Sequence, residues 1–216
     1  MASKTGMDLT TLFGAAAQAL AAQQQILNKA DTNNGDHGDN MVQLFNLITQ
    51  AVSEKKNATP SQQLDHASQL LSQRATSGSS RVYAQGLSLA AQELQGQKSL
   101  NADNAMTLVQ ALLGGSQPPQ KQPGGADLLG SLLGAVTQAQ QPQQQTQQSA
   151  GFDVGDLLNA GMAFMNAKNQ GQDNLQAGLS ALMAAGPFGQ SSYRQQSGQV
   201  VGSALLQVIS AMAAKK

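Results

Sequence analysis

The side chains best suited to catalysis or ligand binding are concentrated in one short segment, residues 33–41, with the sequence NNGDHGDNM. Carboxylates, an imidazole, carboxamides and two glycines stand close together there. Carboxylate and amide oxygens are the ligands that hard cations prefer, and glycine lets a backbone approach an anion closely. The segment therefore predicts a cation and phosphate site. An ordinary polar turn is the competing interpretation, because Asn, Asp and Gly also favour turns for local reasons.

Composition narrows the function classes. Charged residues make up 11% of the chain, the formal net charge is +0 and Trp is absent. Nucleic-acid binding requires a basic surface, so we expect no nucleic-acid partner. The chain has no Cys, which excludes disulfides, thiolate catalysis and Cys-ligated zinc. Its two histidines, His37 and His66, cannot form a three-His metal site.

No apolar run approaches the roughly 20 residues that a membrane-spanning helix needs. The N-terminal segment reads as an amphipathic helix better than as an export signal, because Asp8 interrupts its apolar stretch. We therefore expect no membrane partner and a cytoplasmic location.

Helical periodicity dominates the chain, and no alternating strand pattern is evident. Asp39 is the expected N-cap of the second helix, and Thr59 opens the third with a capping-box pattern that ends at Gln62. Ile26 belongs to the apolar stripe of the first helix, and Gly78 to Ser80 form a short break before the fourth. The predicted helices cover about residues 8–29, 39–52, 60–71, 83–94, 101–112, 127–139, 153–168, 174–185 and 198–214. The expected fold class is all-α, an antiparallel bundle or closed helical barrel.

Two low-complexity stretches interrupt this pattern, SQPPQKQPGG at 116–125 and QQPQQQTQQS at 140–149. Pro- and Gln-rich sequence of this kind is typical of disordered connections. We interpret residues 1–216 as a single domain whose insertion, residues 116–150, carries one short helix. The methionines, Met162 and Met165 among them, are expected to fill the core.

Three segments together resemble one family. Asp36-His37-Gly38-Asp39-Asn40-Met41 resembles the D-H-G-x-N-M signature of DhaL, the nucleotide-binding subunit or domain of dihydroxyacetone kinases. Gly78-Ser79-Ser80-Arg81 resembles that family's G-A-S-G-P segment, with Arg81 in place of Pro. Ser192-Tyr193, followed by Gly202-Ser203, resembles its final S-Y…D-P-G-A loop.

The resemblance implies an antiparallel eight-helix barrel that binds Mg²⁺ and ADP or ATP at one end. The dihydroxyacetone substrate would then sit on a separate partner subunit or domain. The residues that match the family's nucleotide contacts are His37, Gly38, Asn40, Met41, Gly78, Ser79 and Ser80. The metal positions fall at or near Asp31, Asn34 and Asp36.

This chain departs from the family's metal pattern D-x4-D-x-D-H-G. Asp36 keeps the third aspartate, but Asn34 stands at the second position. An ungapped alignment places Lys29 at the first position, and Asp31 could substitute only if the loop slips. Magnesium relies on carboxylates to offset its dehydration, so the resemblance implies a weakened metal site. In the last loop, Val200-Val201-Gly202 replaces the family's acidic D-P-G.

Three functional hypotheses follow. The chain could be a pseudoenzyme of this family that senses a nucleotide or binds a protein, or an active phosphotransferase subunit of dihydroxyacetone kinase type. It could also be an unrelated helical interaction protein whose loop matches by chance. Convergence of the segments around Asp36, Ser79 and Ser192 at one end of the fold would disfavour the last hypothesis.

Overall fold

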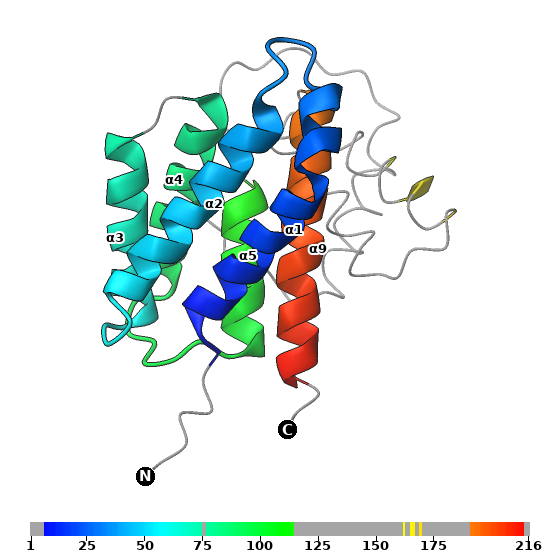
Figure 1. The fold of residues 1–216 in the computed structure, drawn as a ribbon. Coiled ribbons are helices and arrows are strands. Elements are labelled where there is room, and N and C mark those ends of the chain that lie inside the picture. Colours follow the sequence, from blue (N-terminus) through cyan, green and yellow to red (C-terminus); the bar gives the residue numbers. More distant parts are fainter. Residues whose placement is uncertain are drawn as a thin grey trace, which may run out of the picture. The chain divides into compact units, whose positions relative to one another are not determined.

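The computed structural model describes residues 7–74, 77–114 and 191–213, together with the helical positions Met162, Met165, Asn166 and Asn169. The three described ranges belong to one compact unit (Figure 1). Its named helices are α1 (Leu9–Ala30), α2 (His37–Glu54), α3 (Pro60–Gln73), α4 (Gly78–Glu93), α5 (Ala102–Gly114) and α9 (Ser192–Ala213). Apart from an isolated bridge between Met7 and Leu100, these ranges form no β structure. The predicted all-α fold class is confirmed for this part of the chain.

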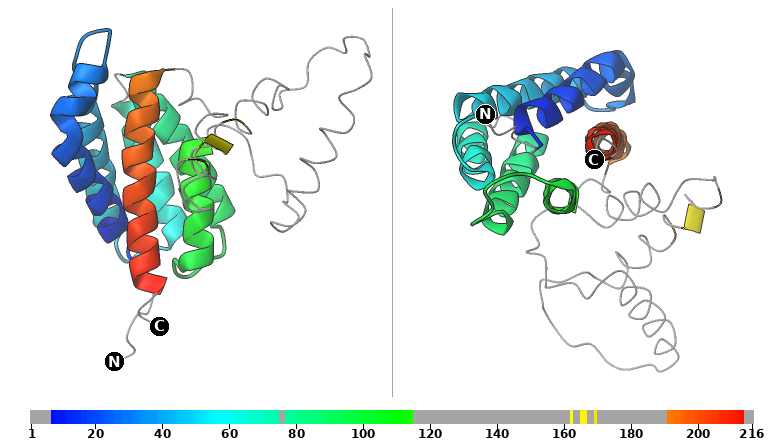
Figure 2. Two further views of the ribbon diagram at one scale, coloured as in Figure 1. Left: turned by 90° about the vertical axis from the view of Figure 1, so that its right-hand side faces the viewer. Right: turned by 90° about the horizontal axis from the view of Figure 1, so that it is seen from below.

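The helices pack in a closed circuit. Each of α1 to α5 contacts the next in sequence, and α9 contacts both α5 and α1. Figure 2 shows this circuit end-on, with α9 between the first and the fifth helix. Because successive helices are antiparallel, the α1–α2 loop and the starts of α4 and α9 lie at the same end, the upper end in Figure 1.

Apolar stripes face the inside of this circuit. The Phe45 ring meets the Tyr83 ring edge-on at 5.0 Å between centroids, and Phe13 lies 6.4 Å from Phe45. All three side chains are fully buried. Rings of this size supply a large share of the buried apolar area, so they fix α1, α2 and α4 against one another.

Local signals place several helix ends where the sequence predicts them. Thr59 accepts a hydrogen bond from the Gln62 N–H, and the Gln62 side chain returns to the Thr59 N–H, which confirms the capping box. Asn101 and Asn104 exchange side-chain and backbone bonds at the start of α5 in the same manner. None of the described helices is long and apolar enough to cross a bilayer.

Three predicted helix starts are wrong. Helix α2 begins at His37 and not near Asp39, so Asp36 occupies the N-cap position. Helix α4 already begins at Gly78, because Ser77 accepts the Ser80 N–H as its N-cap. Helix α9 begins at Ser192 and not near Gly198.

Some burial predictions are also wrong. Ile26 is 58% exposed, because the adjacent Leu27 supplies the buried side chain of that turn. Met162 and Met165 are 64% and 67% exposed, so they do not fill the core. The insertion at 116–150 and the predicted helices at 127–139 and 174–185 lie outside the described residues, as does most of the one at 153–168.

Candidate functional site

Side chains from α1 hold the first turn of α2. The Asn28 Oδ1 atom accepts hydrogen bonds from the backbone N–H of Gly38, at 2.6 Å, and of Asp39, at 3.2 Å. An N-cap residue normally satisfies these N–H groups, but here Asp36 makes no such bond and Asn28 supplies the acceptor from another helix. Gln24, one turn earlier on α1, donates to the Asp39 carboxylate. The first turn of α2 is therefore bonded to neutral carboxamides.

The glycine of the D-H-G motif has a steric reason to be there. A Cβ at Gly38 would lie 2.1 Å from the Gln24 carbonyl oxygen and 2.7 Å from Asn28 Oδ1. Real Cβ atoms do not come that close to backbone, so α1 and α2 approach to a distance that only glycine permits. Gly38 thus sets the position of the motif against α1.

The carboxylates of Asp31 and Asp36 accept hydrogen bonds from residues close by in the sequence. Asp31 ends α1 and accepts the Asn33 N–H at 3.0 Å. Asp36 accepts a hydrogen bond from Asn40 Nδ2 at 2.6 Å. Asn34 is exposed. Asp39, expected as the N-cap, lies inside the first turn of α2.

His37 joins this loop to α9. Its imidazole is 5% exposed, and its Nε2 atom lies 2.9 Å from the Ser197 hydroxyl. The Tyr193 ring packs edge-on against it, with 4.7 Å between ring centroids. The Tyr193 hydroxyl in turn accepts a hydrogen bond from Asn33 Nδ2 at 3.1 Å. Two residues of α9, Tyr193 and Ser197, therefore fix the motif and its loop.

Burial lowers the pKa of His37 from its ordinary value. Asp31 and Asp36 raise it and Arg194 lowers it, but desolvation is the largest cause. The imidazole is consequently neutral near pH 7, while two carboxylates and a guanidinium act on it electrostatically.

The start of α4 completes this end of the fold. Ser79 and Ser80 are buried, at 4% and 8% exposed, and a Cβ at Gly78 would lie 2.7 Å from the Arg194 Nη2 atom. Arg194 also lies over the Tyr193 ring, 5.8 Å from its centroid. Arg81, which stands in place of the family's Pro, is exposed, and Arg194 is the cation that contacts the site.

The candidate nucleotide residues therefore come together only in part. His37, Gly38 and Asn40 lie in the first turn of α2, at the same end as Gly78, Ser79 and Ser80. Met41 is fully buried and supports the motif from the core.

The metal donors fit the family's two magnesium ions poorly. No group of three or more His, Cys, Asp or Glu side chains gathers in a metal-binding arrangement among the residues that the structure describes. The side chains that α1 directs at the motif, Asn28 and Gln24, are neutral. Lys29, the residue at the first metal position by ungapped alignment, is exposed. The dehydration of two Mg²⁺ ions has to be offset by carboxylates, and the described residues bring too few of them together.

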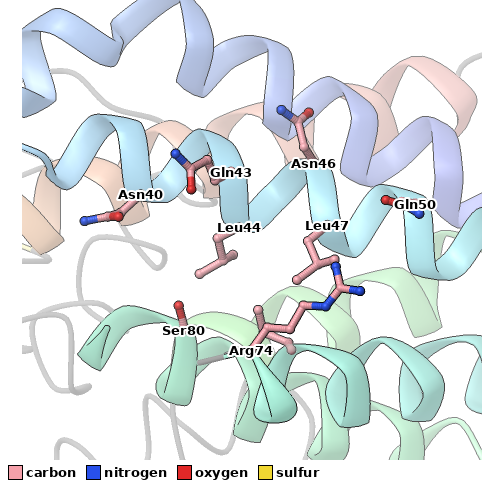
Figure 3. A pocket seen from close by; sticks show the side chains of 9 residues that line it. Asn40, Gln43, Leu44, Asn46, Leu47, Gln50, Arg74 and Ser80 are labelled. Atoms are coloured by element: carbon pink, nitrogen blue, oxygen red, sulfur yellow. The ribbon is translucent and has the colours of Figure 1, made fainter. Parts of the chain in front are cut away.

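A groove of about 480 Å³ opens beside the site (Figure 3). Asn40 and Ser80 belong both to this groove and to the site. Exposed carboxamides of α2 and the Arg74 side chain border a floor of leucines. The full lining consists of Asn40, Gln43, Leu44, Asn46, Leu47, Gln50, Leu71, Arg74 and Ser80.

Three segments distant in sequence thus meet at one end of the helices, the arrangement expected of a common binding site. The family model of the DAK2 domain matches residues 31–153, more than half of the chain. The chain belongs to the DAK2-domain family. This is the DhaL-type domain of the dihydroxyacetone kinases, so the hypothesis of an unrelated helical protein is wrong. Comparison with curated proteins and with solved structures gave no match.

The DAK2 match begins at Asp31 and so includes the whole motif loop and helices α2 to α5. Helix α9 lies beyond it. The family match therefore does not cover Tyr193, Arg194 and Ser197, whose contacts with the site are given by the structure.

Proposed function

We propose that this DAK2-domain protein is a nucleotide-sensing pseudoenzyme, which retains an anion-binding end but has lost the metal chemistry of phosphotransfer. The observation that carries the proposal is the convergence of the starts of α2, α4 and α9 around His37 and Arg194. Helix starts direct N–H groups and a positive dipole end toward an anion. Arg194 adds a full positive charge beside them.

The anion-binding groups are best placed between α4 and α9. Asn28 already engages two N–H groups of α2, whereas Gly78 and Ser79 donate to no described residue. The guanidinium of Arg194 lies against Gly78. We assign the phosphates of a bound nucleotide to this junction.

The loss of phosphotransfer is supported by the donors that face the motif. Asn34 offers a neutral oxygen where the family relies on a carboxylate, and Asn28, which contacts the motif from α1, is neutral too. Asp36 and Asp39 are bonded to the side chains of Asn40 and Gln24. In this family phosphotransfer needs metal ions to neutralise the phosphates. Fold and family alone do not guarantee the activity.

The test is a calorimetric titration of the purified protein with ADP and ATP, with and without magnesium. We expect binding of similar strength in both conditions. Micromolar binding that requires magnesium, about −8 kcal/mol, would overturn the loss of metal chemistry and favour an active subunit that works with a dihydroxyacetone-binding partner. Absence of binding in all titrations would overturn nucleotide sensing and leave protein binding as the role of this end.

A restoration variant makes the test sharper. Asn28→Asp combined with Asn34→Asp places one carboxylate against the first turn of α2 and restores one in the loop, so magnesium should now strengthen nucleotide binding. Lys29→Asp with Asn34→Asp should do so less, because Lys29 is exposed. Asn57→Asp, exposed in the loop between α2 and α3 at the other end of the helices, is the control for added negative charge.

A further inference from the structure

The contact between His37 and Ser197 bears on which nitrogen of the imidazole carries the proton. Ser197 is fully buried, and its Oγ atom has two polar neighbours. His37 Nε2 lies at 2.9 Å and the Arg194 carbonyl oxygen also at 2.9 Å. Both contacts have the length of hydrogen bonds.

A serine hydroxyl has one proton to give, and a carbonyl oxygen can only accept. If Ser197 donates to His37, its contact with the Arg194 carbonyl brings two oxygens together without a proton between them. If His37 donates, Ser197 is left to donate to the carbonyl, and both contacts are hydrogen bonds. The second arrangement satisfies all three of these groups, and hydrogen-bonded polar groups are the rule in protein interiors.

We propose that Ser197 is a positioning residue that holds His37 as the Nε2-protonated tautomer, so that Nδ1 meets the ligand as a hydrogen-bond acceptor. The group of the ligand next to His37 must then be a donor, such as a sugar hydroxyl or an ordered water, and not a phosphate oxygen. The part that concerns the ligand rests on the proposed function. The tautomer itself does not.

The ring orientation supports this assignment. A half-turn of the imidazole would replace Nε2 with a carbon opposite Ser197 and leave the hydroxyl without its second partner. Tyr193 packs edge-on against the ring and is itself held by Asn33. His37 Nδ1 makes no hydrogen bond to any residue that the structure describes. The nitrogen left for a ligand is therefore an acceptor.

This assignment divides the recognition of a nucleotide between two side chains. Arg194 is a pure donor and suits phosphate oxygens. The lone pair of a neutral imidazole repels them. His37 and Arg194 lie at the same end of the fold, so together they would distinguish the sugar part of a ligand from its anionic part.

The experiment is a nitrogen NMR spectrum of the ¹⁵N-histidine-labelled protein at pH 8, where an imidazole of ordinary pKa is neutral. The chain has only two histidines, so His37→Gln identifies the signals of His37. We expect a pyrrole-type shift for Nε2, with its proton protected from exchange, and a pyridine-type shift for Nδ1. A pyridine-type Nε2 in the unmodified protein would overturn the proposal.

Ser197→Thr keeps the hydroxyl and should retain the protected Nε2 proton, whereas Ser197→Ala should lose the protection and mix the tautomers. An unchanged His37 spectrum in Ser197→Ala would show that Ser197 does not position the ring. Circular dichroism of both variants separates this effect from unfolding, and the spectrum of the unmodified protein tests the tautomer in any case.

Addition of ADP separates the two proposals. A moderate shift of Nδ1 toward the pyrrole range, with one ring proton retained, indicates a donor group and supports the inference. If both ring nitrogens of His37 become protonated when ADP is added, a phosphate oxygen contacts the ring, and the assignment of the ligand group is overturned. If ADP neither binds nor changes the spectrum, the nucleotide proposal and the ligand assignment fail together, while the tautomer is judged from the spectrum of the protein alone.

Discussion

The guanidinium of Arg194 on α9 rests on the backbone of Gly78, the first residue of α4. A single methyl group at position 78 would come within 2.7 Å of the Arg194 Nη2 atom. The missing side chain of one residue thus makes room for the charge of another, more than a hundred positions later in the chain. This relationship ties the start of α4 to the only cation found in contact with the site in the described residues.

Gly78→Ala should separate the charge from the site without unfolding the protein. The clashing atom ends a flexible side chain, so Arg194 moves away, and stability should stay within about 0.5 kcal/mol of the unmodified protein. Nucleotide affinity should fall roughly tenfold, equivalent to about 1.4 kcal/mol. Calorimetry and thermal unfolding measure the two effects. Gly14→Ala is the control, since a Cβ there meets only Thr49 at 3.8 Å. Unchanged affinity would remove Arg194 from the proposed site.

Gly38→Ala should instead destabilise the fold. Its Cβ would overlap the Gln24 carbonyl oxygen, a backbone atom that cannot move without shifting α1. Overpacking of this kind costs about 1–3 kcal/mol. Urea unfolding of Gly38→Ala beside Gly14→Ala measures the difference. Equal midpoints would mean that α1 and α2 are not in close contact at Gly38.

The pKa of His37 predicts how stability depends on pH. Burial depresses the pKa in the folded protein below its value in the unfolded chain, so the unfolded chain binds more protons in between. The contribution of the neutral His37 to the free energy of unfolding is therefore complete above about pH 6.5. It is lost as the pH falls toward the pKa of His37 in the folded protein. Urea midpoints at pH 7.5 and 5.5 should differ more in the unmodified protein than in His37→Gln. Equal differences in the two proteins would contradict the depressed pKa.

The capping box of α3 gives a prediction independent of the site. Thr59→Ala removes the acceptor of the Gln62 N–H and should cost about 1 kcal/mol, or about 2–4 °C in Tm. Thr59→Ser keeps a hydroxyl and should restore most of the loss. Thermal unfolding of the two variants measures this. A Thr59→Ala protein as stable as Thr59→Ser would show that the hydroxyl does not stabilise the start of α3.

Those parts of the fold that depend on local sequence could be predicted. The apolar period of α2, with Met41, Phe45 and Ile48, matches its buried residues. The capping box at Thr59 lies within one turn of its own helix, so its signal is complete in the sequence. Such features need no knowledge of distant residues.

The rest depends on contacts between distant segments. Asn28 takes the place of the N-cap of α2 from another helix, and α2 begins at His37, before the predicted start near Asp39. Residues near Ser197 are polar and rich in Gly and Gln, so their sequence indicated a loop. Their burial against His37 becomes evident only in the structure, and it accounts for a helix start at Ser192.

The bonds from Asn33 to Tyr193 and from His37 to Ser197 each span 160 positions. During synthesis the motif and helices α1 to α5 therefore leave the ribosome well before the residues that close the site. Chains usually begin to fold from the N-terminal side, so a growing chain would carry the complete D-H-G motif with one side of its pocket missing. The proposed ligand site would then be complete only after α9 has been synthesised. A protein cut just ahead of Ser191 and deprived of α9 would keep every residue of the D-H-G motif but lose the bonds to Asn33 and His37.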